Sequence, residues 1–175
     1  MQAEAPEPIT TREAWEMTCH EAGHAAVAVH FGISFTHVER DGLYYGLVDA
    51  VARPLEFAPN GEWRGGTPDE VSQLHLYFAG GEAAEQLLFG KLRGKNADGT
   101  GPYGIDKGRH GECEELLCNN RCDGWEKDIQ SAMKVLAGDL ESVLKIATEL
   151  GRRITKGSDR RERLTDDEVL QSSGP

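Results

Sequence analysis

The chain has 175 residues, of which 28% are charged, and its formal net charge at pH 7 is -11. This length suits one domain, and the acidic balance argues against nucleic acid or an anionic lipid surface as a main partner. No apolar run reaches the length of a membrane span, and residues 1–8 are acidic and proline-rich, unlike a signal or transit peptide. We therefore expect a cytoplasmic protein without membrane insertion, whose four cysteines are thiols or metal ligands.

The first predicted element is a helix over about residues 11–31. Thr10 and Glu13 have the spacing of a capping box, and Gly32 is a typical stop. Residues 25–29 are apolar on every face of the helix, which indicates that it is buried.

Residues 20–24 of this helix read H-E-A-G-H, which fits the pattern H-E-x-x-H. Residues four apart lie on one face of a helix, about 6 Å apart along its axis, so His20 and His24 can share one Zn²⁺. Glu21 lies beside them and can accept a proton from a water whose pKa the metal lowers to about 7. The pattern predicts metal-assisted hydrolysis of a peptide bond, with Glu21 as the general base.

Two short strands are expected next, at 35–39 and 43–51, on either side of the hairpin signal Asp41-Gly42. The second strand follows the metal helix and is the candidate edge for binding an extended peptide. A second helix is expected from Thr67, a good N-cap, to Phe89. Its central Gly80-Gly81 pair would let another helix approach closely, and the metal helix is the natural candidate.

Residues 91–123 are rich in glycine, asparagine and charge, and are expected to form an insertion with one short helix around 112–117. A third helix is predicted to begin near Gly124. Another follows Gly138 and ends near Thr155. The remainder is charged, with Thr165 capping a last short turn or helix.

A catalytic zinc takes three protein ligands and leaves one position for water. Besides the two histidines, the main candidates are Glu85 and Asp128, followed by His75, Asp123 and His110. A second, structural zinc site is a weaker hypothesis, because its residues have the spacing H-x2-C-x4-C-x3-C without any C-x-x-C pair. Its residues would be His110, Cys113, Cys118 and Cys122, and ordinary thiols in the insertion are the alternative.

Three segments, in order, read HEAGHAAVA at 20–28, AGGEAAEQLLFG at 79–90 and GWEKDIQSAMKVL at 124–136. Together they resemble the peptidase domain of the FtsH-type zinc metallopeptidases, the membrane-bound AAA proteases. The resemblance implies that Asp128 is the third zinc ligand. It implies that Glu85 supports the site without touching the metal.

The fold implied is mainly α (α+β), a helical zincin-like peptidase domain with a small β-hairpin or sheet over the metal helix. The sequence divides into a disordered N-terminus at 1–9, the zinc metallopeptidase domain at 10–157 and a charged tail or short helix at 158–175. The chain carries no AAA module, since nothing matches the P-loop pattern G-x-x-x-x-G-K-[ST].

The expected function is that of a zinc-dependent metalloendopeptidase that cleaves flexible or unfolded polypeptides and needs no ATP on its own. The resemblance leaves a homo-oligomer, a separate ATPase or an adaptor open as partners. Two alternatives remain at this point: a soluble regulatory zinc peptidase of narrow specificity, and a non-catalytic zinc-binding interaction module. The intact Glu21 argues against the second, because a purely structural site has no use for a base there.

Overall fold

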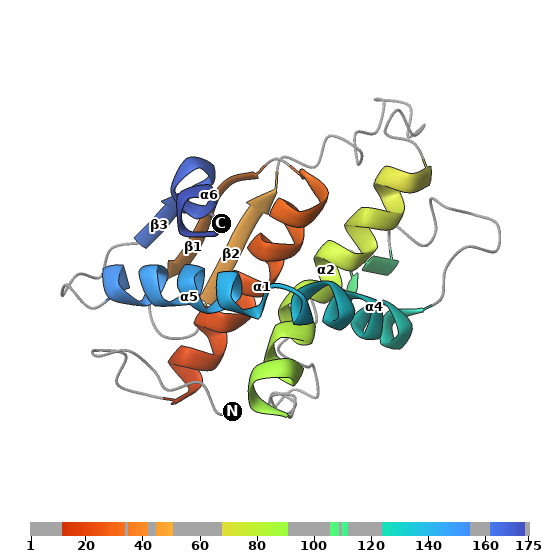
Figure 1. The fold of residues 1–175 in the computed structure, drawn as a ribbon, viewed down its shortest axis with the longest axis horizontal. Coiled ribbons are helices and arrows are strands. Elements are labelled where there is room, and N and C mark those ends of the chain that lie inside the picture. Colours follow the sequence, from red (N-terminus) through yellow and green to blue (C-terminus); the bar gives the residue numbers. More distant parts are fainter. Residues whose placement is uncertain are drawn as a thin grey trace.

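The computed structural model describes residues 12–33, 35–41, 45–50, 68–90, 106–108, 110–111, 124–154 and 162–173. The helices are α1 (Arg12–Phe31), α2 (Pro68–Phe89), α4 (Trp125–Ala137), α5 (Leu140–Ile154) and α6 (Asp166–Ser173). The strands are β1 (Phe35–Asp41), β2 (Tyr45–Ala50) and β3 (Glu162–Thr165). The described part is thus mostly helical with a small antiparallel sheet, as predicted (Figure 1). The expectations for residues 1–9, for Thr67 and for most of 91–123 lie outside the described residues.

Glycines end the first two long helices, as the sequence predicted. Gly32 has a φ of 66°, and its N–H donates to the carbonyl of Val29 while the N–H of Ile33 donates to that of Ala28. This pair of hydrogen bonds satisfies the last carbonyls of α1 and requires a left-handed residue, which glycine adopts without steric cost. Gly90, with a φ of 69°, closes α2 in the same conformation.

Helix α1 lies at the centre of the fold, in contact with α2, α4, α5, β1 and β2 (Figure 1). Its buried apolar side chains lie on several faces, which is what a helix surrounded by neighbours requires. They are Ala14, Trp15, Cys19, Ala22, Ala25, Ala26, Val27 and Ala28. Most of these side chains are small, so neighbouring helices can approach the α1 backbone closely.

The sheet has the strand order β2-β1-β3, with both pairs antiparallel. The β1–β2 pair confirms the hairpin predicted around Asp41-Gly42. Strand β3 was not predicted, because the sequence over 158–175 indicated only a charged tail or a short helix. In the structure Val38 of β1 pairs with Leu164 of β3, and both side chains are fully buried. Residues 162–173 therefore belong to the same core as α1.

Helix α6 begins with the cap that Thr165 predicted. The backbone N–H of Thr165 donates to Glu168 Oε2 at 2.9 Å, and the backbone N–H of Glu168 donates to Thr165 Oγ1 at 3.4 Å. Arg153 of α5 also donates two hydrogen bonds to the Glu168 carboxylate, at 2.7 and 3.2 Å. The bond from Arg153, together with those from Thr165, lowers the pKa of Glu168 to about 2. One carboxylate thus joins α5 to the start of α6.

We expect Glu168→Gln to lower the free energy of unfolding by about 1 kcal/mol at pH 7, the usual magnitude for a helix cap and a partly exposed ion pair. Because folding lowers the pKa of Glu168 from 4.5 to about 2, its contribution is complete above pH 4.5 and is lost as the pH falls toward 2. Urea unfolding of both proteins at pH 7 and pH 3 should therefore show a difference that shrinks in acid.

Glu141→Gln is the matched control, because Glu141 pairs with Lys145 of the same helix through a side chain that is 80% exposed. Such an i,i+4 pair stabilises by only a few tenths of a kcal/mol, about 0.3–0.5. An equal loss for the two variants, or a Glu168→Gln loss that does not change with pH, would contradict the assignment.

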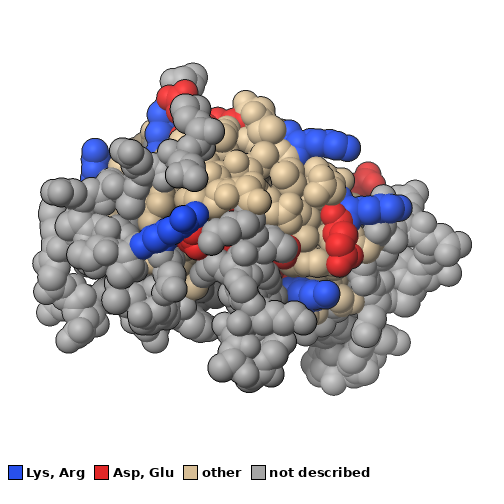
Figure 2. All heavy atoms as spheres, turned by 90° about the horizontal axis from the view of Figure 1, so that it is seen from below, with Lys and Arg blue, Asp and Glu red and all other residues tan. Residues whose placement is uncertain are grey.

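The described surface mixes charges of both signs. On the face in Figure 2, the Lys and Arg side chains of the described residues lie beside Asp and Glu side chains and do not form an area of one sign. No helix in the described part of the chain combines the length and the apolar character needed to cross a membrane.

Candidate metal centre

Close packing of α1 on α2 positions the two histidines of the H-E-x-x-H pattern. A Cβ built on Gly23 would lie 2.6 Å from the Ala84 Cβ and against the Gly80 carbonyl, so only glycine fits at this crossing. A Cβ built on Gly81 would lie 2.5 Å from the His20 Nε2, so a larger residue at this position would collide with the His20 ring. The prediction that the glycines of α2 receive the metal helix is therefore confirmed.

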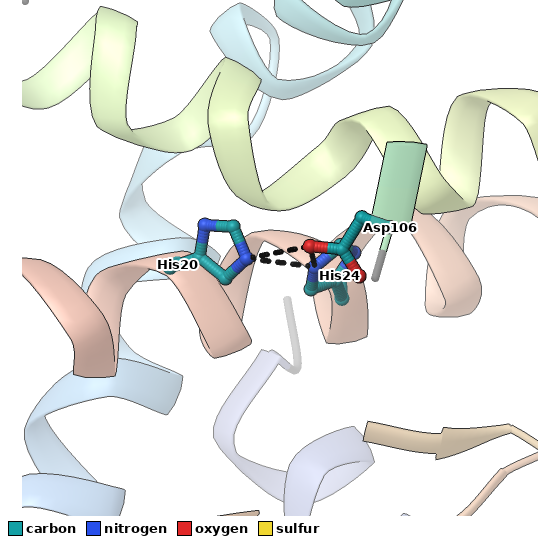
Figure 3. Close-up of side chains that lie close together, drawn as sticks. All are labelled: His20, His24 and Asp106. Carbon is teal, nitrogen blue, oxygen red and sulfur yellow. Dashed lines mark hydrogen bonds and ion pairs between the residues drawn. The ribbon is translucent and has the colours of Figure 1, made fainter. Parts of the chain in front are cut away.

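The imidazoles of His20 and His24 converge on one point together with the carboxylate of Asp106 (Figure 3). The two Nε2 atoms lie 3.1 Å apart, and Asp106 Oδ2 lies 3.1 Å from that of His20 and 3.5 Å from that of His24. Tetrahedral Zn²⁺ with bonds of about 2.0–2.1 Å places its ligand atoms about 3.3 Å apart. All three separations fall close to that value.

A hydrogen bond on the far side of the His24 ring and a carboxylate contact on the far side of the His20 ring set the orientation of the histidines. His24 Nδ1 lies 2.7 Å from the carbonyl oxygen of Tyr77, which can only accept, so this nitrogen carries the proton. His20 Nδ1 lies 3.0 Å from Glu85 Oε1. With both Nδ1 atoms engaged, the Nε2 lone pairs are directed at the centre, as in carboxylate–histidine–metal arrangements. Glu85 thus lies beside His20 but is not one of the three residues whose ligand atoms converge.

The electrostatics of the centre favour a positive charge between the three side chains. Burial lowers the pKa of His20, but the contacts with Asp106 and Glu85 outweigh burial and raise it to about 10. Burial opposes ionisation of Asp106, yet the two histidines hold its pKa well below the usual range. A proton held there occupies the position that a cation would take.

Glu21 is buried beside this centre, with 4% of its surface exposed. Its negative charge contributes to the raised pKa of His20. The group of three converging ligand atoms does not include it. Its role as a general base outside the ligand set stays a prediction.

Asp128 lies in a different cluster from the one that the resemblance implied. Its Oδ2 is 2.7 Å from His110 Nε2 and 3.6 Å from His75 Nδ1, and these three residues form a second group able to hold a metal ion. Asp128 lies in the first turn of α4, as its place in the sequence predicts. Which histidine it contacts depends on how α4 packs against α2, and in the structure α2 brings His75 to it. The carboxylate that lies beside the two histidines of the H-E-x-x-H pattern in the structure is that of Asp106, not that of Asp128.

The other predicted ligands divide between these groups and the part of the chain that is not described. His110 belongs to the second group together with His75. Its proposed cysteine partners lie outside the described residues, as does Asp123, so the H-x2-C-x4-C-x3-C hypothesis stays a prediction. Cys19 is buried in α1.

Sequence reasoning missed Asp106, which lies in the segment expected to be an insertion. Residues 106–108 and 110–111 are helical, although the flanking sequence has no apolar period. The one available signal is the four-residue spacing of Asp106 and His110, which places two ligand types one helical turn apart.

The described residues thus contain two buried His/His/Asp groups, each of which could hold a metal ion. In the first, three ligand atoms have separations that suit a tetrahedral cation, and the Nδ1 atom of each histidine contacts an oxygen of α2. In the second, two histidines and a carboxylate come from three separate segments. No protein-family model matches the chain, and no curated protein matches it.

Proposed function

We propose that the chain is a zinc-dependent metallopeptidase with a zincin-like active site, related to the FtsH-type peptidases, in which His20, His24 and Asp106 hold the metal. The observation that carries this proposal is the convergence of two Nε2 atoms and one carboxylate oxygen at separations of 3.1–3.5 Å. Two histidines and one carboxylate are the ligand set of many zinc hydrolases.

The three ligands leave a fourth position open for the reaction. Exposure indicates the direction from which that position is reached: the side chain of Asp106 is 23% exposed, against 4% for each histidine. A substrate carbonyl would therefore approach on the side of Asp106.

Zn²⁺ supplies Lewis-acid activation of water and of the substrate carbonyl when it is bound. Glu21 accepts the proton of the attacking water, and the oxygen forms a bond to the carbonyl carbon. The carbon–nitrogen bond then breaks, and Glu21 returns the proton to the leaving amine. Glu85 and the carbonyl of Tyr77 keep the two imidazoles in orientation throughout.

Strand β2 is the proposed binding edge for the substrate. It is one of the two outer strands in the order β2-β1-β3 and contacts α1, the helix that carries His20 and His24. An extended peptide could add to its edge through main-chain hydrogen bonds. The strand lies within residues 43–51, the stretch that the sequence suggested for this role.

The test is hydrolysis of one disulfide-stabilised domain in two forms, native and reduced with its thiols alkylated, without ATP. We expect cleavage of the unfolded form and none at core sites of the native form, because opening a stable core costs up to about 5–15 kcal/mol. A chelator should abolish cleavage, and Zn²⁺ should restore it.

The variant Asp106→Ala should lose the zinc held by His20 and His24 together with hydrolysis, whereas His30→Ala, at an exposed position of α1, should lose neither. Zinc bound at full stoichiometry without cleavage of the unfolded form would overturn the proposal. That result would favour a narrow-specificity regulatory peptidase or a non-catalytic zinc module.

A further inference from the structure

The second cluster, defined by His75, His110 and Asp128, is built from three separate segments of the chain. His75 comes from α2, Asp128 from the first turn of α4, and His110 from the short helical stretch 110–111. The side chains are 4%, 2% and 13% exposed. All three are therefore largely removed from water. Burying an ionisable group costs free energy unless it is paired or bound to a cation.

The cluster is more than a single histidine–aspartate hydrogen bond, because a second histidine faces the same carboxylate oxygen. Asp128 Oδ2 faces His110 Nε2 at 2.7 Å and His75 Nδ1 at 3.6 Å, on either side of the ligand separation of about 3.3 Å in tetrahedral zinc sites. The rings of His75 and His110 lie 4.5 Å apart with an interplanar angle of 32°. Two buried imidazoles therefore face the same carboxylate oxygen.

Aromatic and acidic side chains of α4 and α2 surround His110. The ring of Trp125 meets that of His110 edge to face at 5.1 Å, and the Trp125 indole N–H donates to Glu82 Oε2 at 3.1 Å. Trp125 and Asp128 are three residues apart on α4, so they share one face of that helix. The Trp125 ring therefore helps to hold the His110 ring beside the Asp128 carboxylate.

One short segment supplies a residue to each of the two clusters. Asp106, which faces His20 and His24, and His110 are four positions apart, and both lie in helical residues. An isolated helical stretch of this length is not stable in water, so its position depends on the contacts that its side chains make. Whatever holds His110 therefore also restrains Asp106.

We propose that His75, His110 and Asp128 form a second site for a transition-metal cation, and that its occupancy fixes the segment that presents Asp106 to the first site. Imidazole nitrogen with one carboxylate favours Zn²⁺ or a similar metal over Mg²⁺ or Ca²⁺, which take oxygen ligands. The coupling to catalysis rests on the proposed function, whereas metal binding itself does not.

The first test is the number of zinc ions per chain after reconstitution and gel filtration, measured by elemental analysis. We expect two for the wild type, one for His75→Ala and one for Asp128→Ala, and two for His30→Ala. One ion in the wild type that is unchanged in His75→Ala would overturn the second site, even if the first site hydrolyses peptides. Two ions without hydrolysis would support it while the proposed function fails.

The second test is the affinity of the remaining ion in His75→Ala, measured by competition with a chromophoric chelator. We expect this affinity to be about 10–100-fold weaker than the affinity of the wild type for its tighter ion. Mutations of residues that hold a metal ligand in place usually weaken binding by this factor. Thermal unfolding of the metal-free proteins checks that the fold is retained, and Asp128→Asn provides a conservative second variant. An unchanged affinity in both variants would overturn the coupling between the sites.

Discussion

The variant Glu21→Gln is expected to bind as much zinc as the wild type and to hydrolyse an unfolded polypeptide about 10²–10⁴-fold more slowly. Glutamine has nearly the same shape as glutamate but cannot accept the proton of the attacking water. Metal binding should survive because the three converging ligand atoms belong to His20, His24 and Asp106. Zinc content and initial rates at saturating peptide measure the two effects separately.

Glu16→Gln is the control for this substitution. Glu16 lies on the same helix and is 5% exposed, but its carboxylate pairs with Arg12 and is not among the converging ligand atoms. Its loss should leave the rate within about twofold, the scale of an effect below 0.5 kcal/mol. Wild-type turnover in Glu21→Gln would exclude Glu21 as the base, and loss of zinc in that variant would make it a ligand.

Gly23→Ala is expected to have the largest effect on the fold. A methyl group at this position would press on the carbonyl of Gly80 and lie 2.6 Å from the Ala84 Cβ. Neither neighbour can rotate away, so α1 and α2 must move apart. Overpacking of this kind costs about 1–3 kcal/mol or more. The distance between His24 and the Tyr77 carbonyl, which lies on α2, would change with the helix spacing.

Thermal unfolding should therefore show a melting temperature about 2–12 °C lower for Gly23→Ala, given about 2–4 °C per kcal/mol for a domain of this size. Zinc affinity should fall in parallel. Gly138→Ala is the control, because its nearest atom would be 3.5 Å away and its φ of -74° suits alanine. A Gly23→Ala protein as stable as Gly138→Ala would show that the helices do not cross as closely as described.

Local signals in the sequence account for the helices. Capping patterns and the stop glycines depend on residues close in the chain, and Gly32 and Gly90 end α1 and α2 as predicted. The H-E-x-x-H pairing is equally local, since the helical repeat alone brings His20 and His24 together. The close approach at Gly80 also followed, because few residues other than glycine allow two helix backbones to touch.

Ligands supplied from distant segments could not be predicted in the same way. Asp106 lies in a stretch without apolar periodicity, and its contact with α1 depends on tertiary packing. Asp128 was placed on the correct helix, but the choice between His20 and His75 as its neighbour depends on how α4 sits along α2. In strand β3 the buried Leu164 stands among charged residues of the sequence, so the pairing of this strand with β1 leaves almost no hydropathy pattern.

The position of β3 also bears on the order in which the molecule assembles. Strand β1 pairs with β2 through a short connection but with β3 only across most of the chain length. Closing so long a loop is slow, so the third strand joins after local contacts have formed. During synthesis, both His/His/Asp groups leave the ribosome before β3 does. A nascent chain whose sheet is still incomplete would therefore already contain all the residues of both groups that could hold a metal ion.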